Sequence, residues 1–254
     1  MHATLTNIPP APGKRAALRS LTGGPLRPGT IELTAAAVRR LGLQRGAKLL
    51  DMGCGYGASL TMLQSEFDLN VFGLDIDLGK LGDLRKEGSG LALVQADAGR
   101  TPFLSRSMDA VLCECILSLL GCADDALREI ARVLRPGGFL VLSDIYVRSQ
   151  EGRGAEDRNQ PSGPLTCCLD YAMDRPGVES LLSRRGFEVL SFEDHTQLLT
   201  RLAAKLVFTF GSLEAYWETL LPPARAAKAC AAGERLKPGY GVFLARKEER
   251  HDHR

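Results

Sequence analysis

Short apolar runs alternate with amphipathic helical patterns between residues 47 and 143. The runs are rich in aliphatic and β-branched residues, as strands are, and they cover residues 47–52, 70–74, 91–96, 108–113 and 139–143. Helical patterns lie between them at 59–65, 78–87 and 124–134, and Pro136-Gly137-Gly138 ends the last of these helices. This alternation predicts a parallel sheet with right-handed crossover connections.

The rest of the chain is predicted to complete the sheet and to add helices beside it. The expected elements are a polar loop over 148–163, a helix over 174–185, a sixth strand over 187–192, an apolar helix over 197–221 that is interrupted near Gly211-Ser212, and a last strand over 240–246. Pro222-Pro223 ends the apolar helix. The pattern therefore predicts seven strands, with a helical insertion of about forty residues between the sixth and the seventh.

Composition and charge narrow the class of protein. With 254 residues, of which 44% are hydrophobic, the chain can form one full-sized α/β domain with a subdomain inserted in it. The 32 basic and 30 acidic side chains leave a net charge of +2. Such a balance gives no electrostatic reason to expect a nucleic-acid or membrane partner.

No segment of the sequence is expected to direct the chain out of the cytoplasm. There is no apolar run of about 18 residues that could span a membrane. No apolar region follows Lys14, Arg15 and Arg19, as one would in a signal peptide. The seven cysteines lack the spacing of a disulfide framework, which favours reduced thiols. We therefore expect a cytoplasmic protein.

The candidate chemistry begins at the turn after the first predicted strand, where Asp51 is followed by glycines at 53, 55 and 57. Glycines there let a ligand approach the peptide groups, at the edge where doubly wound sheets bind ligands. The dinucleotide fingerprint needs its third glycine three residues after the second, whereas here the interval is two and Ala58 follows. No Gly-Lys-Ser or Gly-Lys-Thr completes a P-loop. The turn favours a ligand without a pyrophosphate, and a dinucleotide-dependent oxidoreductase is a weaker alternative.

Two further acidic residues follow strand ends at the same edge. Asp75 ends the second predicted strand about twenty residues after the glycines, where a carboxylate can accept hydrogen bonds from both ribose hydroxyls. Asp97 follows the third strand, in a place suited to the amino group of adenine. A single acid of this kind is commonly only a turn residue, but Asp51, Asp75 and Asp97 in series predict a nucleoside-binding edge.

Five motifs in the same order and spacing give residues 27–146 a specific family resemblance. The motifs are LDMGCGYG at 50–57, GLD at 73–75, ADA at 96–98 with PF at 102–103, MDAV at 108–111 and EIARVLRPGG at 129–138. The region resembles a class I S-adenosylmethionine (SAM)-dependent methyltransferase of the type found in quinone biosynthesis and arsenite methylation. The resemblance implies SAM as the cofactor and a Rossmann-like, doubly wound α/β fold, with a seven-stranded sheet whose last strand is antiparallel.

The resemblance also implies roles for single residues. Those implied to bind the cofactor are Asp51, Gly53, Cys54 and Gly55 at the methionine part, Asp75 at the ribose, Ile76 against adenine, and Asp97 with Ala98 at the adenine edge. Glu114 and Cys115, after the fourth strand, are implied to line the methyl-transfer side. Residues 27–29 with Leu33 and Thr34 resemble the lid that covers the cofactor in this family.

The residues that contact the acceptor are harder to predict from the sequence than those that bind the cofactor, because an enzyme assists an in-line methyl transfer mainly by proximity and alignment. His195, flanked by Glu193 and Asp194 after a strand end, is a candidate general base, with a surface or hinge histidine as the alternative. The apolar stretch 198–220 is predicted to pack as core, with a pocket for a hydrophobic acceptor or a dimer surface as alternatives.

The cysteines raise a separate hypothesis. Cys54, Cys115, Cys167 and Cys168 could approach the sulfonium and bind a thiol-seeking metalloid. Cys167-Cys168 is a vicinal pair without metal-site spacing, so we expect small buried side chains and no metal site.

The sequence thus predicts an enzyme that uses SAM to methylate a small-molecule acceptor, with a homodimer as one form of assembly. A SAM-binding regulatory or partner subunit without catalysis, and methylation of a thiol or metalloid acceptor, are the alternatives. The predicted organisation is an N-terminal lid or flexible segment at 1–30, a SAM-binding core at 31–147, an acceptor-side cap that completes the sheet at 148–246, and a charged tail at 247–254.

Overall fold

A computed structural model describes residues 27–86, 90–148 and 167–249 of the chain. Most of the predicted segment 1–30, nearly all of the predicted loop 148–163 and the end of the charged tail lie outside the described residues. Every strand predicted from the sequence lies within the described ranges.

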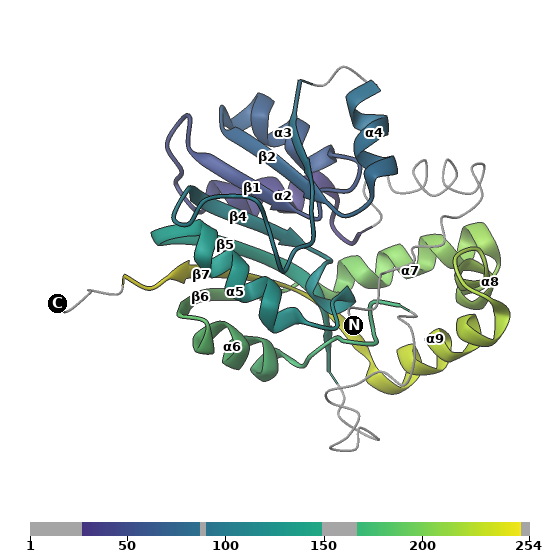
Figure 1. The fold of residues 1–254 in the computed structure, drawn as a ribbon. Helices are drawn as coiled ribbons and strands as arrows, with labels where there is room; N and C mark the ends of the chain where they lie inside the picture. The colour runs from purple at the N-terminus through teal and green to yellow at the C-terminus, as the bar shows by residue number, and fades with distance from the viewer. Residues whose placement is uncertain (1–26, 87–89, 149–166, 250–254) are drawn as a thin grey trace.

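The described residues form one seven-stranded sheet with the strand order β3-β2-β1-β4-β5-β7-β6 (Figure 1). Its strands are β1 (Lys48–Met52), β2 (Asn70–Asp75), β3 (Ala92–Gln95), β4 (Met108–Glu114), β5 (Leu134–Val147), β6 (Phe187–Asp194) and β7 (Pro238–Lys247). Strands β1 to β5 pair in parallel, whereas β7 is antiparallel to both β5 and β6. The Rossmann-like, seven-stranded sheet with an antiparallel last strand is confirmed. β5 is longer than the predicted 139–143 at both ends, because Leu134 already pairs with Met108 of β4 and the strand pairs with β7 as far as Val147.

Helices cover both faces of this sheet (Figure 1). On one face pack α2 (Thr30–Arg39), α3 (Ala58–Phe67) and α4 (Leu78–Lys86), and on the other pack α5 (Ala123–Val133) and α6 (Arg175–Arg184). The short helix η1 (Leu117–Leu119) follows β4, and α7 (Thr196–Phe210), α8 (Leu213–Glu218) and α9 (Pro223–Leu236) form a group beyond one end of the sheet. Within the described ranges, no helix is both long enough and apolar enough to cross a membrane.

Successive residues of the central strands supply two apolar cores. Leu50 and Val111 belong to the core under α5 and α6, while Leu49 and Leu112 belong to the core under α2 and α3, and all four side chains are fully buried. Burying each of them stabilises the fold by roughly 1.5–3 kcal/mol. Parallel strands that are buried on both faces appear in a sequence as continuous apolar runs, which explains why β1 and β4 are predicted so clearly.

The first of two α-helices that the sequence analysis does not predict is α2, which occupies part of the predicted lid. It begins after Gly29, whose φ is +88°, and it buries Thr34, Ala35 and Val38. Because several of its buried residues are small alanines, α2 gives only a weak periodic signal in the sequence.

The second is α9, which begins at Pro223. Proline at the first helical position loses no hydrogen bond, so the Pro222-Pro223 pair that ends one helix also begins the next. The predicted helical insertion between the sixth and seventh strands is confirmed, and so is its interruption near Gly211-Ser212. Ser212 caps α8 by accepting a hydrogen bond from Ala215 N at 3.0 Å.

A largely buried carboxylate fixes the loop between β3 and β4. Glu129 Oε1 accepts hydrogen bonds from Thr101 N at 2.7 Å and from Thr101 Oγ1 at 2.9 Å, and its carboxylate pairs with Arg132 on the same helix. Arg132 also donates to the carbonyl oxygen of Phe103 at 2.8 Å. The hydrogen bond from Arg132, together with those from Thr101, lowers the pKa of Glu129 from 4.5 to about 2.

Glu129→Gln is expected to lower the free energy of unfolding at neutral pH by about 1–3 kcal/mol, because hydrogen bonds to a charged group are weakened. The folded-state pKa is depressed, so this stabilisation is present above the unfolded-state pKa and is lost as the pH falls from 4.5 toward about 2. Urea denaturation followed by circular dichroism over that range measures the difference between wild type and variant.

The matched control is Glu188→Gln, which removes one partner of an exposed pair with Arg246. It should change stability by less than about 0.5 kcal/mol. Equal losses of unfolding free energy in the two variants would contradict a stabilising role of the ionised Glu129 carboxylate. A loss in Glu129→Gln that does not become smaller at low pH would contradict it as well.

Candidate functional site

The turn after β1 adopts backbone conformations that favour glycine, and it is bonded to the end of β2. Gly53 and Gly55 have φ angles of +81° and +56°. Gly53 N and Cys54 N both donate to the carbonyl oxygen of Leu74, at 2.6 and 2.9 Å. A Cβ on Gly53 would lie 2.2 Å from Cδ1 of Ile116, so a larger residue would displace that side chain. The turn therefore presents peptide groups that a ligand can approach closely.

Asp75 fastens the turn to β2 through its carboxylate. Oδ2 accepts a hydrogen bond from Gly55 N and Oδ1 accepts one from Asp77 N, each at 2.9 Å. Lys80 Nζ lies 3.7 Å from Oδ1. Since an ionised carboxylate offers about four acceptor positions, Asp75 retains positions for the hydroxyls of a ribose.

Asp51 is a buried carboxyl group at the end of β1, only 3% exposed. Burial raises its pKa well above the usual range, and the negative charge of Glu114 adds to the shift, while Arg27 opposes it. A cationic group bound beside Asp51 would favour its ionised form. The residue therefore fits the ammonium group of an amino-acid ligand such as the methionine part of SAM.

A buried ion pair lies next to Asp51. Arg27 and Glu114 are in direct contact, and their side chains are only 5% and 7% exposed. Thr34 Oγ1 and Ser59 Oγ donate to Glu114 at 2.8 and 3.1 Å, and Arg27 donates to both hydroxyls. The network joins the segment before α2 to α2, α3 and β4. Because neither charge faces water, each depends on the other for its stability.

A cavity of about 540 Å³ extends from the glycine turn to helices α7–α9. We call the part next to the turn the cofactor half, and it is lined by Gly53, Leu74, Asp75, Ile76, Lys80, Ala96, Asp97, Ala98 and Ile116. Asp97 Oδ1 accepts a hydrogen bond from Gly99 N at 2.7 Å, which orients its carboxylate. A few acids on an otherwise apolar wall suit a sugar joined to an aromatic base.

The other part of the cavity, which we call the acceptor half, is almost entirely apolar. Its wall consists of leucines from η1, from α7 and from residues 220–221, with Ile145, Pro222, the rings of Tyr216 and Trp217, the cysteines Cys115, Cys167 and Cys168, and Arg225. The two rings pack with their centroids 5.1 Å apart. The apolar stretch 198–220 therefore lines a pocket, which was one of the alternatives to simple core packing.

Cys115 lies next to Ile116 and has a backbone conformation that is rare for residues other than glycine, with φ at +53°. Its backbone N–H donates to the carbonyl oxygen of Ser143 at 2.8 Å. Its thiol donates to the hydroxyl of Tyr240 at 3.8 Å, and that hydroxyl donates to Ser143 Oγ at 3.0 Å. Burial raises the pKa of Cys115, so its side chain is a neutral part of the wall.

Asp144 holds the wall segment that follows Cys115. It accepts hydrogen bonds from Ser118 N at 2.9 Å, Ser118 Oγ at 2.5 Å and Ile145 N at 2.7 Å. Burial raises the pKa of Asp144 to about 6 despite these bonds. Because Ser118 belongs to η1, Asp144 fixes the position of Leu119, the next residue of η1, which lines the cavity.

The structure brings most of the residues predicted for the cofactor and for the methyl-transfer side to one place. Gly53, Asp75, Ile76, Asp97, Ala98 and Cys115 line the cavity. Gly55 is bonded to Asp75. Glu114 belongs to the buried network with Arg27, and Asp51 is buried near it, so neither carboxyl group is part of the cavity lining. The side chain of Cys54 packs in the core with α2 and α3. The functional roles given to these residues stay predictions.

His195 is placed at the start of α7, outside the lining of the cavity. Its Nε2 lies 3.1 Å from Oε2 of Glu193, which also pairs with Arg40. Its backbone N–H donates to the carbonyl oxygen of Tyr240 at 2.8 Å, which ties α7 to β7. A role as general base stays a prediction.

The lining residues that sequence reasoning did not identify include Lys80, Ile116 and Arg225. Ile116 has no polar atom, and its position directly after Cys115 is the only available clue. Lys80 lies in the first turn of α4, where its Nζ reaches back to Asp75. Arg225 belongs to α9, a helix that the sequence analysis did not predict.

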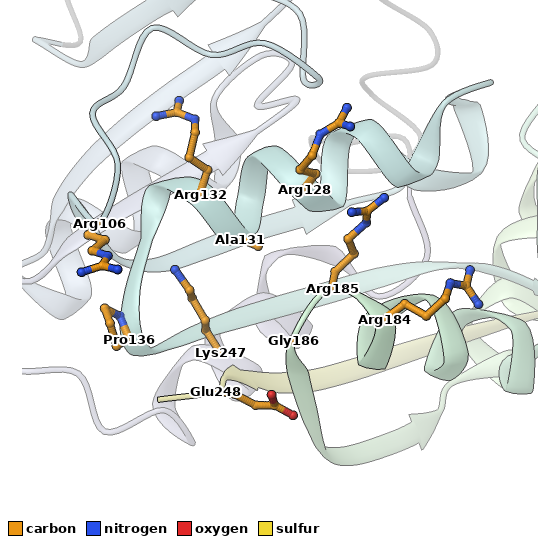
Figure 2. Close-up of a pocket in the computed structure, with 10 residues that line it drawn as sticks. All are labelled: Arg106, Arg128, Ala131, Arg132, Pro136, Arg184, Arg185, Gly186, Lys247 and Glu248. Atoms are coloured by element: carbon orange, nitrogen blue, oxygen red, sulfur yellow. The ribbon is translucent and has the colours of Figure 1, made fainter. Parts of the chain in front are cut away.

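A second hollow, of about 320 Å³, lies at the opposite end of the sheet, where β5 and β6 begin (Figure 2). Its charged lining residues are Arg106, Arg128, Arg132, Arg184, Arg185, Lys247 and Glu248. Three of the arginines pair with acids, namely Arg128 with Asp125, Arg132 with Glu129 and Arg185 with Asp124. Lys247 Nζ donates to the carbonyl oxygen of Leu134 at 2.7 Å. Because much of this charge is engaged within the fold, we place the candidate site in the larger cavity.

Comparison with known proteins identifies related sequences and structures. Residues 50–142 match the family described as "Methyltransferase domain". Fatty-acid O-methyltransferase from Mycolicibacterium smegmatis is 36% identical over 106 residues, which are 41% of this chain and 39% of that protein. The chain spans 47% and 39% of the length of the first two curated relatives that it matches.

Solved structures share the fold over nearly the whole chain. The [4+2]-cyclase SpnF superposes with a TM-score of 0.71 at 22% identity, over 92% of both chains. Phosphoethanolamine N-methyltransferase 2 of Haemonchus contortus, in complex with phosphomonomethylethanolamine and S-adenosylhomocysteine, superposes with a TM-score of 0.66 at 20% identity, over 92% of this chain and 57% of that one.

Arg27→Met and Glu114→Gln are each expected to lower the free energy of unfolding by about 3 kcal/mol, because each leaves a buried network without one of its two charges. The double variant should lose less than the sum of the two, since it leaves no unpaired charge. Urea denaturation of the three variants measures this coupling.

The control is the exposed pair of Arg39 and Glu66, whose atoms are 3.6 Å apart. Arg39→Met and Glu66→Gln should show a coupling of less than about 0.5 kcal/mol. Additive losses at Arg27 and Glu114 would mean that the two buried charges act independently.

Proposed function

Because the chain belongs to the class I SAM-dependent methyltransferases, we propose that it transfers the methyl group of SAM to a small-molecule acceptor held in the acceptor half of the cavity. The observation that carries this proposal is that one continuous cavity joins the glycine turn and Asp75 to the almost entirely apolar acceptor half. A protein that only bound SAM would need the cofactor half alone.

SAM supplies a methyl group attached to a positively charged sulfur. The contacts that we infer for this chain are Asp51 with the ammonium group, the Gly53-Cys54-Gly55 backbone with the rest of the methionine part, Asp75 with the ribose hydroxyls, Ile76 with the face of adenine, and Asp97 with Ala98 at its edge. The free acceptor positions of Asp75 support the third of these.

The protein assists the transfer chiefly by alignment. The accepting atom must approach the methyl carbon from the side opposite sulfur, so both molecules need rigid walls. Asp144 fixes η1, and Ser143 binds the backbone of Cys115, where the two halves of the cavity meet. The apolar acceptor half also excludes water that would otherwise solvate the reacting atoms.

The relatives do not agree on an acceptor. One carries the name of a fatty-acid O-methyltransferase, and a structural neighbour that of a phosphoethanolamine N-methyltransferase. Another neighbour with the same fold carries the name of a [4+2]-cyclase, so the fold alone does not fix the reaction. A SAM-binding subunit without catalysis is therefore the alternative, and a turnover assay separates the two.

A thiol or metalloid acceptor that depends on the protein's cysteines has less support. Within the described part of the chain, no group of three or more His, Cys, Asp or Glu side chains is placed to hold a metal ion. Burial also raises the pKa of Cys115 and Cys168, which keeps both thiols protonated. A cytoplasmic location, a homodimer and the lack of a nucleic-acid partner stay predictions.

Calorimetric titration with SAM, and separately with NAD, tests the cofactor. We expect SAM to bind in the micromolar range and NAD not to bind. Asp75→Ala should weaken SAM binding by about 10- to 100-fold, because charge-assisted hydrogen bonds are lost. Asp83→Ala, on the exposed side of α4, is the control and should leave the affinity unchanged. Absence of SAM binding would contradict the proposed function.

His195→Asn tests the predicted general base. A base in that position would make kcat fall by about 10²–10⁴-fold and would remove one limb of the pH–rate profile, while the affinity for SAM stays the same. The assay is formation of S-adenosylhomocysteine with a reactive acceptor. A change in kcat of less than about threefold would show that His195 is not the base.

A further inference from the structure

The acceptor half of the cavity is poor in groups that could take up a proton. Among the described residues that line it, there is no carboxylate and no imidazole. The groups there that can release a proton are the thiols of Cys115, Cys167 and Cys168 and the phenol of Tyr216. Arg225 is the charged side chain of this part of the lining.

These four groups are protonated near neutral pH and so cannot act as bases. Burial raises the pKa of Cys115, Cys168 and Tyr216, and it raises the pKa of Cys167 to about 11. Behind the wall, Tyr240 is likewise a neutral hydroxyl, because burial raises its pKa as well.

The ionisable groups around the acceptor half are engaged with other partners. Glu114 is bound to Arg27, Asp144 to Ser118, and His195 faces Glu193. The charged residues at the other end of the cavity are Asp75, Lys80 and Asp97, which belong to the cofactor half. An acceptor that must lose a proton during the reaction therefore finds no group in the described wall to receive it.

An apolar wall also discriminates between acceptors by charge. An anionic acceptor and the sulfonium carry opposite charges that disappear as the methyl group moves, and a medium of low dielectric constant favours such a transfer. A neutral amine would instead take over the positive charge that the sulfonium loses, and a cation would form within the apolar acceptor half at a cost in solvation. An alcohol would first have to be deprotonated.

We propose that the acceptor is an apolar carboxylic acid, methylated on a carboxylate oxygen that is already ionised when the acid enters the acceptor half. The proposal rests on the proposed function. A lone pair of that oxygen forms a bond to the methyl carbon while the carbon–sulfur bond breaks and its electron pair passes to sulfur. The products are a methyl ester and S-adenosylhomocysteine, and no proton is released.

Arg225 gives this part of the lining a positive charge. It lies in the first turn of α9, is half-buried, and lines the cavity beside Leu221 and Pro222. Its charge attracts an anionic acceptor, while the leucines and the rings of Tyr216 and Trp217 contact the hydrocarbon part. Arg225 is thus a binding residue for the acid and takes no part in the bond changes.

Binding is measured first, without turnover. Trp217 is the single tryptophan of the chain and lies in the acceptor half, so its fluorescence reports binding there. The complex with S-adenosylhomocysteine is titrated with octanoic acid, octanol and octylamine. We expect the acid to bind more tightly than the amine, and Arg225→Gln to weaken binding of the acid by about three- to tenfold with little effect on octanol. Lys228→Gln, exposed on the same helix, is the matched control.

Turnover is measured next, with SAM and the same three compounds, and with straight-chain acids from butanoic to dodecanoic acid. Mass spectrometry detects the methylated product and S-adenosylhomocysteine. We expect methyl esters, and a kcat/KM that stays constant between about pH 6 and about pH 9, where a carboxylic acid is fully ionised.

Methylation of octanol or octylamine in preference to every acid would overturn the proposal, and so would a kcat/KM for the acid that rises with pH in this range. A fall of about a hundredfold or more in His195→Asn would identify a protein base and would also overturn it. The same holds if a protein that binds SAM methylates none of the acids. All these results leave the proposed function standing, whereas absence of SAM binding removes the proposed function itself.

Discussion

The hydrogen bonds between the glycine turn and the end of β2 are the contacts on which the cofactor half depends. Gly53 N and Cys54 N share the carbonyl oxygen of Leu74, and Gly55 N binds the carboxylate of Asp75. Because β1, β2 and β3 are adjacent and parallel, their carboxyl ends form one edge. The turn can therefore pack against that edge, and residues far apart in the sequence line one cavity.

The sheet and the cofactor half could be predicted because both depend on local pattern. Buried parallel strands leave continuous apolar runs, and the acids Asp75 and Asp97 follow the ends of such runs. Once strand order is known, a residue at a strand end has little freedom of position, so its place at the edge follows from the backbone. The family resemblance, and not the strand pattern, implied Ile76 and Ala98, which adjoin those acids and also line the cavity.

The acceptor half could not be predicted to the same degree, because its wall is set by tertiary packing. Arg225 reaches the cavity only because α9 forms and packs beside α8. Cys54 and Cys115 have the same chemistry in the sequence, yet one packs in a core and the other lines the cavity. The contact between Arg27 and Glu114 joins residues 87 positions apart, and no pattern in the neighbouring sequence indicates that they are partners.

Cys115 carries a side chain at a backbone angle that glycine would adopt without strain. Holding an L-residue at a φ of +53° costs on the order of 1–2 kcal/mol. Glycine at this position would relax the chain, but it would also delete side-chain atoms that line the acceptor half of the cavity. Replacing Cys115 by glycine would therefore raise thermal stability and lower the discrimination among substrates. Variants selected only for heat resistance would drift toward a wider and less selective active site.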